Sequence, residues 1–327
     1  MEIFDERFDR VTVSGDRQRN SSRPIGCGDE CNELGRRIIT TVVITAERER
    51  RFYDDQYAQF LSLPDHMLRL DRRVLESNLD NPAKPFYERR WLYRASIRAL
   101  EAEPLAGLQV LDYGCGPADF GIWMATEGAR VTLLDLSPAA IELGLRRARA
   151  SGTAVRGIAA DASHLPMLAS REFDLVFACA ALHHTMKYPG ALQELARIMK
   201  PGARLVLCET WGGNPLLNFA RKLKAAAAGE AEEQGEGIIF SRAHLRLLEP
   251  FFDPIDVESR NLLAMGKRLF RGRFESAPVR ACMKALERMD DGLLWIAPAL
   301  RNWCGEAVIT ARRVSRSQRR AIRKSIR

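Results

Sequence analysis

The sequence predicts an α/β fold built on a doubly wound, mostly parallel sheet. Between Leu108 and Glu209, short runs rich in Val, Leu and Ala alternate with segments of helical periodicity, and the connections between them are short. Such runs are typical of strands that helices cover on both faces. Repeated strand–helix units place these strands parallel within one sheet.

Five strands are predicted in this segment, at Gln109–Tyr113, Arg130–Asp135, Val155–Asp161, Asp174–Cys179 and Arg204–Glu209. Ser137 followed by Pro138 predicts the start of the helix after the second strand, because Ser caps helices well and Pro suits their first turn. Pro201 and Gly202 predict the turn that leads into the fifth strand.

The rest of the chain divides by composition into an N-terminal helical cap and C-terminal helical insertions around this core. Aromatic residues alternate with charged ones in the cap, and two prolines, Pro82 and Pro85, break it into helical pieces. Beyond the core we expect helices at 216–228, 241–251 and 279–299, and strands at 255–259 and 307–311. The predicted division is 1–46 (mobile arm), 47–104 (cap), 105–210 (core), 211–311 (cover and last strands) and 312–327 (basic tail).

Composition excludes several classes of protein. The chain has 327 residues, of which 46% are hydrophobic, so disorder throughout is excluded. No apolar run approaches the roughly 20 residues that cross a bilayer, and the first residues show no secretory signal. Seven scattered cysteines do not form a disulfide framework, which favours reduced thiols in the cytoplasm; Cys27 and Cys31 alone are a poor zinc site, and no metal is expected.

The positive charge of the chain is concentrated at its end. Residues 312–327 contain eight Arg or Lys and no acid, so the formal net charge of +8 leaves zero for the rest. A block of like charge is usually a solvated end. A weak contact with an anionic surface is the alternative, and no specific binding to nucleic acid is expected.

The first strand ends in a turn suited to a ligand. Gly114 and Gly116 let the backbone turn tightly and approach a bound molecule, and Asp112 precedes them. The third glycine of the dinucleotide-binding pattern is replaced by Asp119, whose charge would oppose a pyrophosphate. The turn therefore favours a ligand without phosphates.

Two further acids follow the next strands. Asp135 lies 23 residues after Asp112, where a carboxylate can accept from both hydroxyls of a ribose. Asp161 ends the third predicted strand, where a carboxylate could accept from an exocyclic amine. Ligands of open α/β sheets bind at this carboxyl edge. The alternative is that Asp135 and Asp161 only cap local turns.

Taken together, the stretch LDYGCGPADF…VTLLDLS…AADASHLP…FDLVFACAALHH…LQELARIMKPGARLVLCE resembles the class I S-adenosylmethionine-dependent methyltransferases. The resemblance covers 105–210 and is strongest to the type-11 group, which includes ubiquinone and menaquinone biosynthesis enzymes. It implies a Rossmann-like core, S-adenosylmethionine as cofactor and transfer of a methyl group. The cofactor-binding residues that it implies are Asp112, Tyr113, Gly114, Cys115, Gly116, Asp135, Leu136, Asp161, Ala162 and Cys179.

Within the resemblance, the amino-acid end of the cofactor would contact the glycine turn and Asp112. Asp135 would bind the ribose, Asp161 with Ala162 the adenine, and Cys179 would lie beside the methionine moiety. Two positions depart from the family pattern. Lys187 replaces an acid after the histidine pair, which changes the charge near the substrate mouth, and Ala203 replaces a glycine in a turn.

Five further side chains are candidates for the acceptor side. His183 and His184 follow the fourth strand and could remove a proton from an acceptor, or one could only shape the loop. Glu209 ends the fifth strand at the same edge. Tyr53 and Tyr57 share a helix face and could cover the cofactor by cation–π contact, although ordinary packing is the alternative.

These observations predict an enzyme that methylates O, N or C of a small, partly hydrophobic organic acceptor. The apolar segment 209–216 and the later helices would cover that acceptor. A membrane-associated lipid or quinone-type acceptor is the alternative substrate. A dinucleotide-dependent oxidoreductase and a degenerate Rossmann-like binding protein that uses the basic tail are the alternative functions. The oligomeric state stays open.

Overall fold

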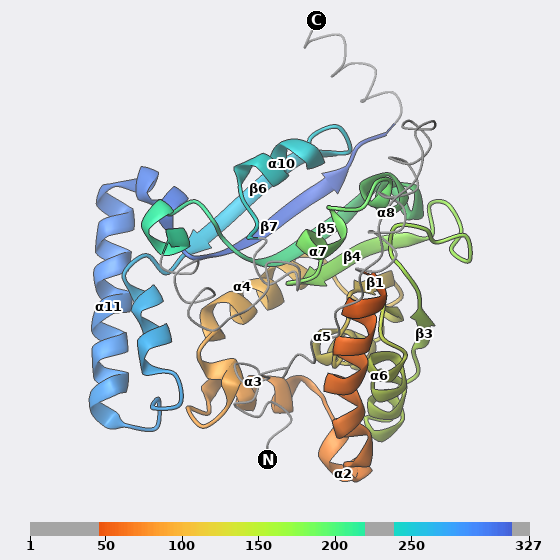
Figure 1. Cartoon of the computed structure of the whole chain (residues 1–327), viewed down its shortest axis with the longest axis horizontal. Coiled ribbons are helices and arrows are strands. Elements are labelled where there is room, and N and C mark those ends of the chain that lie inside the picture. The colour runs from red at the N-terminus through yellow and green to blue at the C-terminus, as the bar shows by residue number, and fades with distance from the viewer. Residues whose placement is uncertain (1–45, 220–238, 316–327) are drawn as a thin grey trace, which may run out of the picture.

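A seven-stranded mixed sheet with the order β3-β2-β1-β4-β5-β7-β6 lies at the centre of the computed structural model, which describes residues 46–219 and 239–315 (Figure 1). The first five of these strands pair in parallel, and β7 is antiparallel to β5 and β6. The strands are β1 (Gln109–Tyr113), β2 (Arg130–Asp135), β3 (Arg156–Ala159), β4 (Phe173–Cys179), β5 (Met199–Thr210), β6 (Phe252–Arg260) and β7 (Glu306–Arg313).

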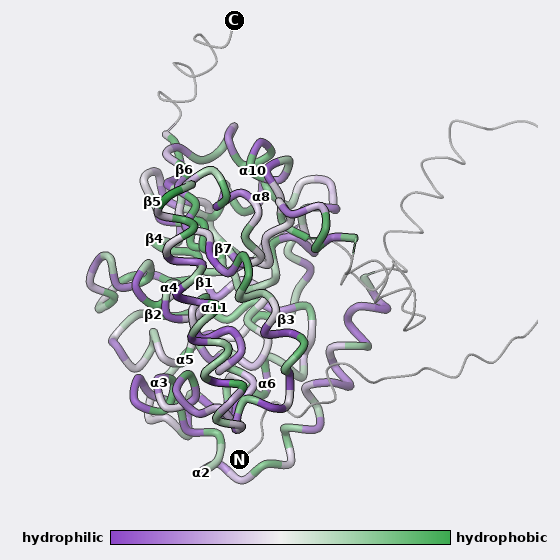
Figure 2. Tube along the Cα trace, turned by 90° about the vertical axis from the view of Figure 1, so that its left-hand side faces the viewer, coloured by the Kyte–Doolittle hydropathy of each residue, from purple (hydrophilic) through white to green (hydrophobic). Residues whose placement is uncertain are grey.

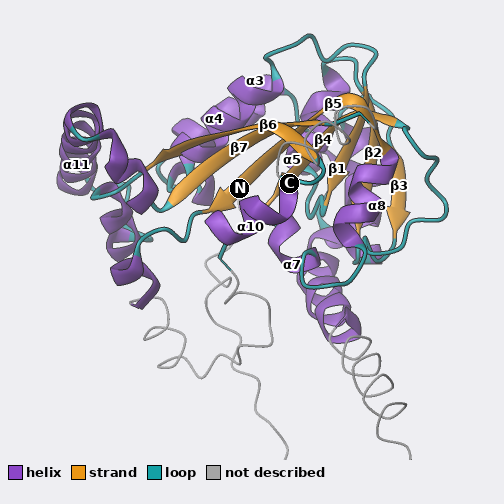
Figure 3. Cartoon of the chain, turned by 90° about the horizontal axis from the view of Figure 1, so that it is seen from above, coloured by secondary structure: helices purple, strands orange, loops and turns teal. Residues whose placement is uncertain are grey.

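Helices cover both faces of the sheet (Figure 3). Successive strand residues point to opposite faces, so Val110 enters the core under α4 and α5 while Leu111 enters the core under α8. The helices are α2 (Asp65–Leu68), α3 (Arg72–Asp80), α4 (Arg90–Leu100), α5 (Asp119–Thr126), α6 (Pro138–Ala150), α7 (Leu182–Thr185), α8 (Ala191–Ile198), α10 (Arg242–Leu248) and α11 (Ala277–Ile296). Short 3-10 turns join them at η2 (Gln59–Ser62), η3 (Pro85–Tyr87), η5 (Ala264–Phe270) and η6 (Pro298–Trp303).

The predicted Rossmann-like α/β fold is confirmed. The strand order reverses between β1 and β4, and such a switch point is where open α/β sheets bind ligands at the carboxyl ends of their strands. The strands predicted at Gln109–Tyr113 and Arg130–Asp135 have the predicted bounds. The fifth is longer than predicted, since it begins at Met199 rather than after the turn.

The third strand is shorter than predicted and ends at Ala159, two residues before Asp161. The Asp161 carboxylate accepts a hydrogen bond from the Ser163 N–H at 2.8 Å, which turns the chain away from the sheet. Asp161 therefore lies in the turn beyond the strand. The residue before it, Ala160, still pairs with the end of β2, because the Ala160 N–H donates to the Asp135 carbonyl at 2.9 Å.

The C-terminal part adds two strands and a long helix at one end of the sheet (Figure 1). The helix expected at 279–299 ends at Ile296, because Pro298 forces the residue before it, Ala297, out of helical geometry, with φ −129° and ψ 75°. β7 continues through Arg313, two residues into the segment assigned to the basic tail.

Several predictions lie partly or wholly outside the described residues. They concern the N-terminal arm with its cysteines, most of the helix expected at 216–228, and the tail from residue 316 onward. In the part of the chain that the structure describes, no helix is both long enough and apolar enough to cross a bilayer.

Candidate functional site

The glycine turn after β1 lies close to Ala181, just before α7, and to Tyr57 of the N-terminal helix (46–58). Gly114 and Gly116 have φ of +65° and +49°, a region that L side chains rarely adopt. A Cβ at Gly114 would lie 2.4 Å from the Ala181 Cβ, and one at Gly116 would lie 2.8 Å from the Tyr57 hydroxyl. The Gly114 N–H donates to the Leu134 carbonyl at 2.8 Å. Both glycines are therefore required by backbone geometry and by close neighbours.

Asp135 connects this turn to the end of β2. Its Oδ2 accepts from the Gly116 N–H at 2.8 Å, and its Oδ1 accepts from the Ser137 N–H at 2.9 Å. Burial raises the pKa of the Asp135 carboxyl, while hydrogen bonds from backbone N–H groups act in the opposite direction. Each carboxylate oxygen keeps a second lone pair. The helix cap itself is Ser137, whose hydroxyl accepts from the Ala140 N–H at 3.1 Å.

Asp112 precedes the glycine turn. It is buried in β1, and burial raises the pKa of its carboxyl well above the ordinary range, although the Gly121 N–H hydrogen bond opposes that shift. The Asp112 Oδ2 lies 2.6 Å from the position that a Cβ on Gly121 would take. A glycine in α5 thus lets this helix approach the carboxyl group.

We expect Asp112→Asn to stabilise the protein at neutral pH. The raised pKa means that the unfolded chain releases a proton that the folded chain retains, so stability falls as pH rises from about 4 toward the folded pKa. The amide cannot ionise, so the variant should lose this part of the pH dependence. Urea unfolding at several pH values measures it, with the exposed Asp55→Asn as control. Equal pH dependence in wild type and Asp112→Asn would contradict the assignment.

Asp119 is paired with a cation, so the electrostatic reason given for a ligand without phosphates does not hold, although the expected cofactor carries no phosphate. Its carboxylate pairs with Arg147 at 2.7 Å, and both side chains are almost fully buried. Arg147 also donates to the carbonyl of Pro117. The pair neutralises Asp119 at the start of α5, so this position presents no uncompensated negative charge to a ligand.

Two residues of the implied cofactor set turn their side chains into the core. Tyr113 is 1% exposed and its hydroxyl donates to the Thr185 Oγ1 at 2.9 Å, which fixes α7. Cys115 is buried as well, and its thiol points to the Gly116 carbonyl at 3.7 Å. Only backbone atoms of these residues remain for a ligand.

Cys179 ends β4 beside Cys208 of β5. A hydrogen bond with the Cys208 thiol, together with burial, raises the pKa of Cys179 well above its ordinary value, so the thiol stays protonated at neutral pH. Ala162 is buried next to Asp161, and Leu136 is partly buried next to Asp135.

His183 and Glu209 form a buried pair at the ends of α7 and β5. The His183 Nδ1 lies 2.8 Å from the Glu209 Oε2, and Glu209 is 0% exposed. The other carboxylate oxygen, Oε1, is buried without a hydrogen-bond partner among the described residues. A carboxylate on Nδ1 places the proton there and leaves Nε2 as the basic nitrogen.

His184 lacks such a partner within the described residues. Its Nδ1 is buried and lies 4.0 Å from the Glu49 carboxylate. The centroids of the His183 and His184 rings are 4.2 Å apart. The two histidines therefore differ in their partners: within the described ranges, a hydrogen-bonded carboxylate orients His183 but not His184.

The N-terminal helix (46–58) lies across this edge, from the start of α6 to the end of α7. Figure 2 shows it rising from α2 as a mostly hydrophilic segment. At one contact the Asp54 Oδ1 accepts from the Ser137 hydroxyl at 2.6 Å and from the Ala139 N–H at 3.2 Å. At the other contact, the Glu49 carboxylate accepts from the Tyr188 hydroxyl at 3.1 Å.

Lys187, the departure from the family pattern, has a partner on this helix. Its Nζ forms an ion pair with Glu49, which is buried. The lysine and the helix are therefore complementary, and the changed charge at position 187 is matched by Glu49 of the N-terminal helix.

The two tyrosines of this helix differ in their surroundings. Tyr57 is buried in a small cluster with Phe60, Leu68 and α6, and its hydroxyl lies over Gly116. Tyr53 stacks on Tyr57 with centroids 6.2 Å apart and meets the His184 ring edge-on at 6.4 Å. Packing accounts for Tyr57, while Tyr53 lies nearer the histidines.

Among the described residues, no group of three His, Cys, Asp or Glu side chains is arranged to hold a metal ion. The candidate functional residues at this edge are thus the acids at the ends of the first strands and the His183–Glu209 pair. The N-terminal helix covers them.

Comparison with known protein families identifies the central part of the chain. Residues 110–202 match the model described as a methyltransferase domain. Residues 110–202 therefore form a methyltransferase domain. The match covers β1 through the first part of β5, which includes the glycine turn, Asp112, Asp135, Asp161 and the two histidines.

The relatives of the methyltransferase domain are named for different substrates. A demethylmenaquinone methyltransferase of Clavibacter sepedonicus is 36% identical over 115 residues, which are 35% of this chain and 45% of that protein. A malonyl-[acyl-carrier protein] O-methyltransferase of Enterobacter lignolyticus is 33% identical over 138 residues, 42% of this chain and 53% of that protein. The chain spans about half the length of the curated relatives it matches.

One solved structure, of a geranyl diphosphate C-methyltransferase from Streptomyces coelicolor A3(2), is 19% identical and covers 83% of this chain and 98% of its own, with a TM-score of 0.49.

Proposed function

We propose that the chain is an S-adenosylmethionine-dependent methyltransferase of a small, partly hydrophobic organic acceptor. The observation that supports this most directly is the link between the glycine turn and Asp135, which places a carboxylate with free lone pairs beside a Cβ-free backbone. The methyltransferase domain match in the same residues supports it independently.

The residues present fit the cofactor. An acidic, glycine-lined edge suits a sulfonium nucleoside that carries an amino group and two ribose hydroxyls. We propose that the amino-acid end of the cofactor contacts Asp112 and the backbone of Tyr113, Gly114, Cys115 and Gly116, at the end of β1. The ribose would contact Asp135 and Leu136, and the adenine would contact Asp161 and Ala162. The methionine chain would contact Cys179 at the end of β4.

Asp135→Ala is expected to weaken binding of S-adenosylhomocysteine by about 1.5–3 kcal/mol, through loss of charged hydrogen bonds to the ribose. Calorimetric titration measures this loss, and Glu127→Gln, exposed at the far end of α5, is the control. Because Asp135 also holds the Gly116 N–H, circular dichroism should confirm that the variant is folded. A folded variant of unchanged affinity would reject the ribose assignment.

When bound, the cofactor supplies an electrophilic methyl group. We propose that His183 acts as general base: its Nε2 accepts the proton that an acceptor loses as it forms the new bond to carbon, and Glu209 stabilises the resulting imidazolium. The N-terminal helix would exclude water and orient the reactants, which is the larger source of rate acceleration in a displacement at carbon.

A panel of candidate compounds can identify the acceptor, because every methyl transfer from S-adenosylmethionine releases S-adenosylhomocysteine. Phenols, amines, carboxylic acids and quinols are each incubated with the protein and S-adenosylmethionine, and this release is measured. Release with one acceptor class and not with others supports the proposal; release with none, in a protein that binds the cofactor, favours the non-enzyme alternative. A quinone-type or lipid acceptor stays the alternative substrate.

We propose the cytoplasm as the location. The described cysteines, which are Cys115, Cys179, Cys208, Cys282 and Cys304, are all free thiols, as is usual in a reducing compartment. A weak anionic contact of the tail stays a proposal as well, and its residues from 316 onward lie outside the described part.

A further inference from the structure

A cluster of positive charge lies where the acceptor would meet the end of β5. Arg89 precedes α4, and its Nη2 donates to the Thr210 Oγ1 at 3.1 Å. Its guanidinium carbon lies 5.9 Å from the centroid of the Tyr93 ring. The Arg89 Nε is buried without a hydrogen-bond partner among the described residues. A buried donor without a partner costs free energy unless a ligand satisfies it.

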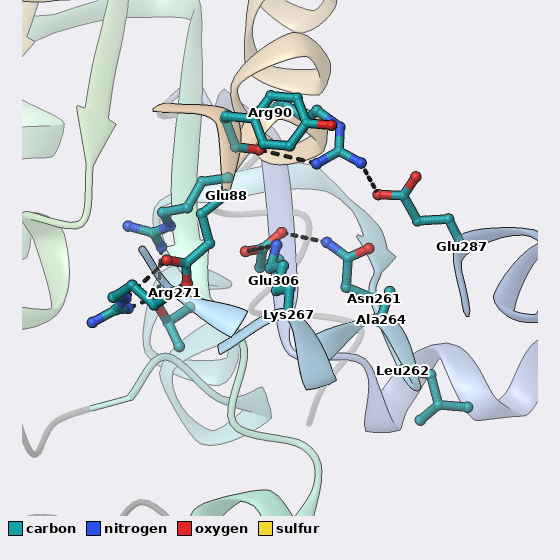
Figure 4. A network of polar contacts seen from close by, with 12 residues as sticks. Glu88, Arg90, Asn261, Leu262, Ala264, Lys267, Arg271, Glu287 and Glu306 are labelled. Atoms are coloured by element: carbon teal, nitrogen blue, oxygen red, sulfur yellow. Dashed lines mark hydrogen bonds and ion pairs between the residues drawn. The ribbon is translucent and has the colours of Figure 1, made fainter. Parts of the chain in front are cut away.

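Three further cations come from η5 and the residue that follows it, namely Lys267, Arg268 and Arg271 (Figure 4 labels the first and last). The Glu306 carboxylate accepts from the Lys267 Nζ at 2.6 Å and from the Asn261 amide at 2.5 Å. Figure 4 shows this contact at the centre of the network.

The second carboxylate of the cluster is also engaged. Glu88 accepts from the Arg271 guanidinium at 2.8 and 3.2 Å. Farther out, Glu287 pairs with Arg90 at 2.5 Å, as Figure 4 also shows. Asp290 accepts from the backbone N–H groups of residues 262–264.

Within the described residues, the charges of the cluster do not balance. Arg89, Lys267, Arg268 and Arg271 face two described carboxylates, Glu88 and Glu306, which are two fewer than the cations. Lys267 and Arg271 hold those carboxylates, and the structure gives neither Arg89 nor Arg268 a carboxylate within ion-pair distance among the described residues. Burial, and then the charge of Arg89, lower the pKa of Arg268.

Neighbouring neutral groups do not compensate this excess. Burial raises the pKa of the Tyr93 phenol well above its ordinary value, so it stays protonated, and the Cys179 thiol does too. Uncompensated charges away from bulk water are unfavourable and are normally paired. Arg89 and Arg268 are each half-buried, although the Nε atom of Arg89 is buried.

The cluster reaches the carboxyl end of β5, the strand that also carries Glu209. Thr210, which Arg89 contacts, directly follows Glu209 in β5, and the charge of Arg89 also interacts with the thiols of Cys179 and Cys208. Successive strand residues face opposite sides, so the Thr210 side chain that Arg89 contacts and the Glu209 side chain lie on opposite faces of the same strand end.

We propose that Arg89 and Arg268 bind an oxyanion of the acceptor, a carboxylate or a phosphate, and so orient an acidic substrate at the end of β5. That the oxyanion belongs to the acceptor rests on the proposed function, whereas the anion site does not. Arginine is suited to the role because its planar guanidinium binds both oxyanions through two parallel hydrogen bonds.

The test uses the full chain without cofactor, with inorganic phosphate and benzoate as separate probes, and follows binding by calorimetry at constant ionic strength. We expect saturable binding of at least one probe. In Arg89→Met and Arg268→Met the affinity should fall at least about tenfold, because a charged hydrogen bond is lost. Arg288→Met, exposed on α11, should bind as the wild type does.

Phosphate binding without benzoate binding would assign a phosphorylated acceptor, and the reverse would assign a carboxylate. No saturable binding of either probe, or equal losses in all three variants, would overturn the anion site. Titration of the same variants with S-adenosylhomocysteine separates the two proposals. If the wild type binds the anion but not S-adenosylhomocysteine, the proposed function fails while the anion site stands.

Discussion

His183→Ala is expected to lower kcat about 100- to 10,000-fold with an acceptor whose reacting group must lose a proton. Glu209 fixes the His183 ring through a 2.8 Å contact to Nδ1, which leaves Nε2 as the basic nitrogen. Removal of the ring would remove the proposed base and leave the proposed cofactor contacts in place. Steady-state kinetics, with S-adenosylhomocysteine affinity measured alongside, check this.

The matched variants distinguish a base from a loop-shaping residue. Glu209→Gln keeps the shape of the pair but not its charge, so we expect a smaller loss of kcat and a shift of the acidic limb of the pH profile. His184→Ala, whose ring has no hydrogen-bonded carboxylate among the described residues, should change kcat far less. If His183→Ala retains kcat within a few-fold, or if only KM rises, His183 is not the base.

Lys267→Met is expected to destabilise the fold by about 3–5 kcal/mol, the cost of leaving one member of a buried ion pair uncompensated. Lys267 and Glu306 are 3% and 1% exposed, and Glu306 lies in β7 opposite Thr210. Because Arg89 also interacts with Glu306, we expect the lower end of that range. Urea unfolding measures the change.

Two controls make this prediction specific. The double variant Lys267→Met/Glu306→Leu removes both charges and should recover most of the lost stability. Arg98→Met breaks the exposed pair with Glu258, which is 3.0 Å long, and should cost no more than about 1 kcal/mol. A loss for Lys267→Met as small as that for Arg98→Met would show that the buried pair does not compensate a buried charge.

Local sequence features predicted the core of the fold well. β1 and β2 have their predicted bounds because buried parallel strands are recognisable as apolar runs. The glycine turn could also be predicted, since the positive φ of Gly114 and Gly116 requires glycine. The end of β3 was misjudged, because the turn at Asp161 depends on a single side-chain hydrogen bond.

Contacts between distant residues could not be predicted in the same way. Lys187 and its partner Glu49 are 138 residues apart, and Arg89 and Thr210 are 121 apart. Nothing in one sequence says which of many acids and bases meet. The neutralisation of Asp119 by Arg147 was missed for the same reason, and with it the weakness of the electrostatic case against a pyrophosphate.

The His183–Glu209 pair could be predicted only in part. Both residues were predicted at the carboxyl edge from their positions after two neighbouring strands. Their hydrogen bond depends on where α7 packs, and α7 contacts β1 through the Tyr113–Thr185 hydrogen bond, which the local pattern does not contain. The sequence therefore indicated the candidates, and the packing of α7 selected one histidine.

The most direct test is a calorimetric titration of the chain with S-adenosylhomocysteine, set beside an identical titration with NAD. We predict saturable one-site binding of S-adenosylhomocysteine and no binding of NAD. Binding of NAD in place of S-adenosylhomocysteine, or no binding of S-adenosylhomocysteine by the folded protein, would contradict the account.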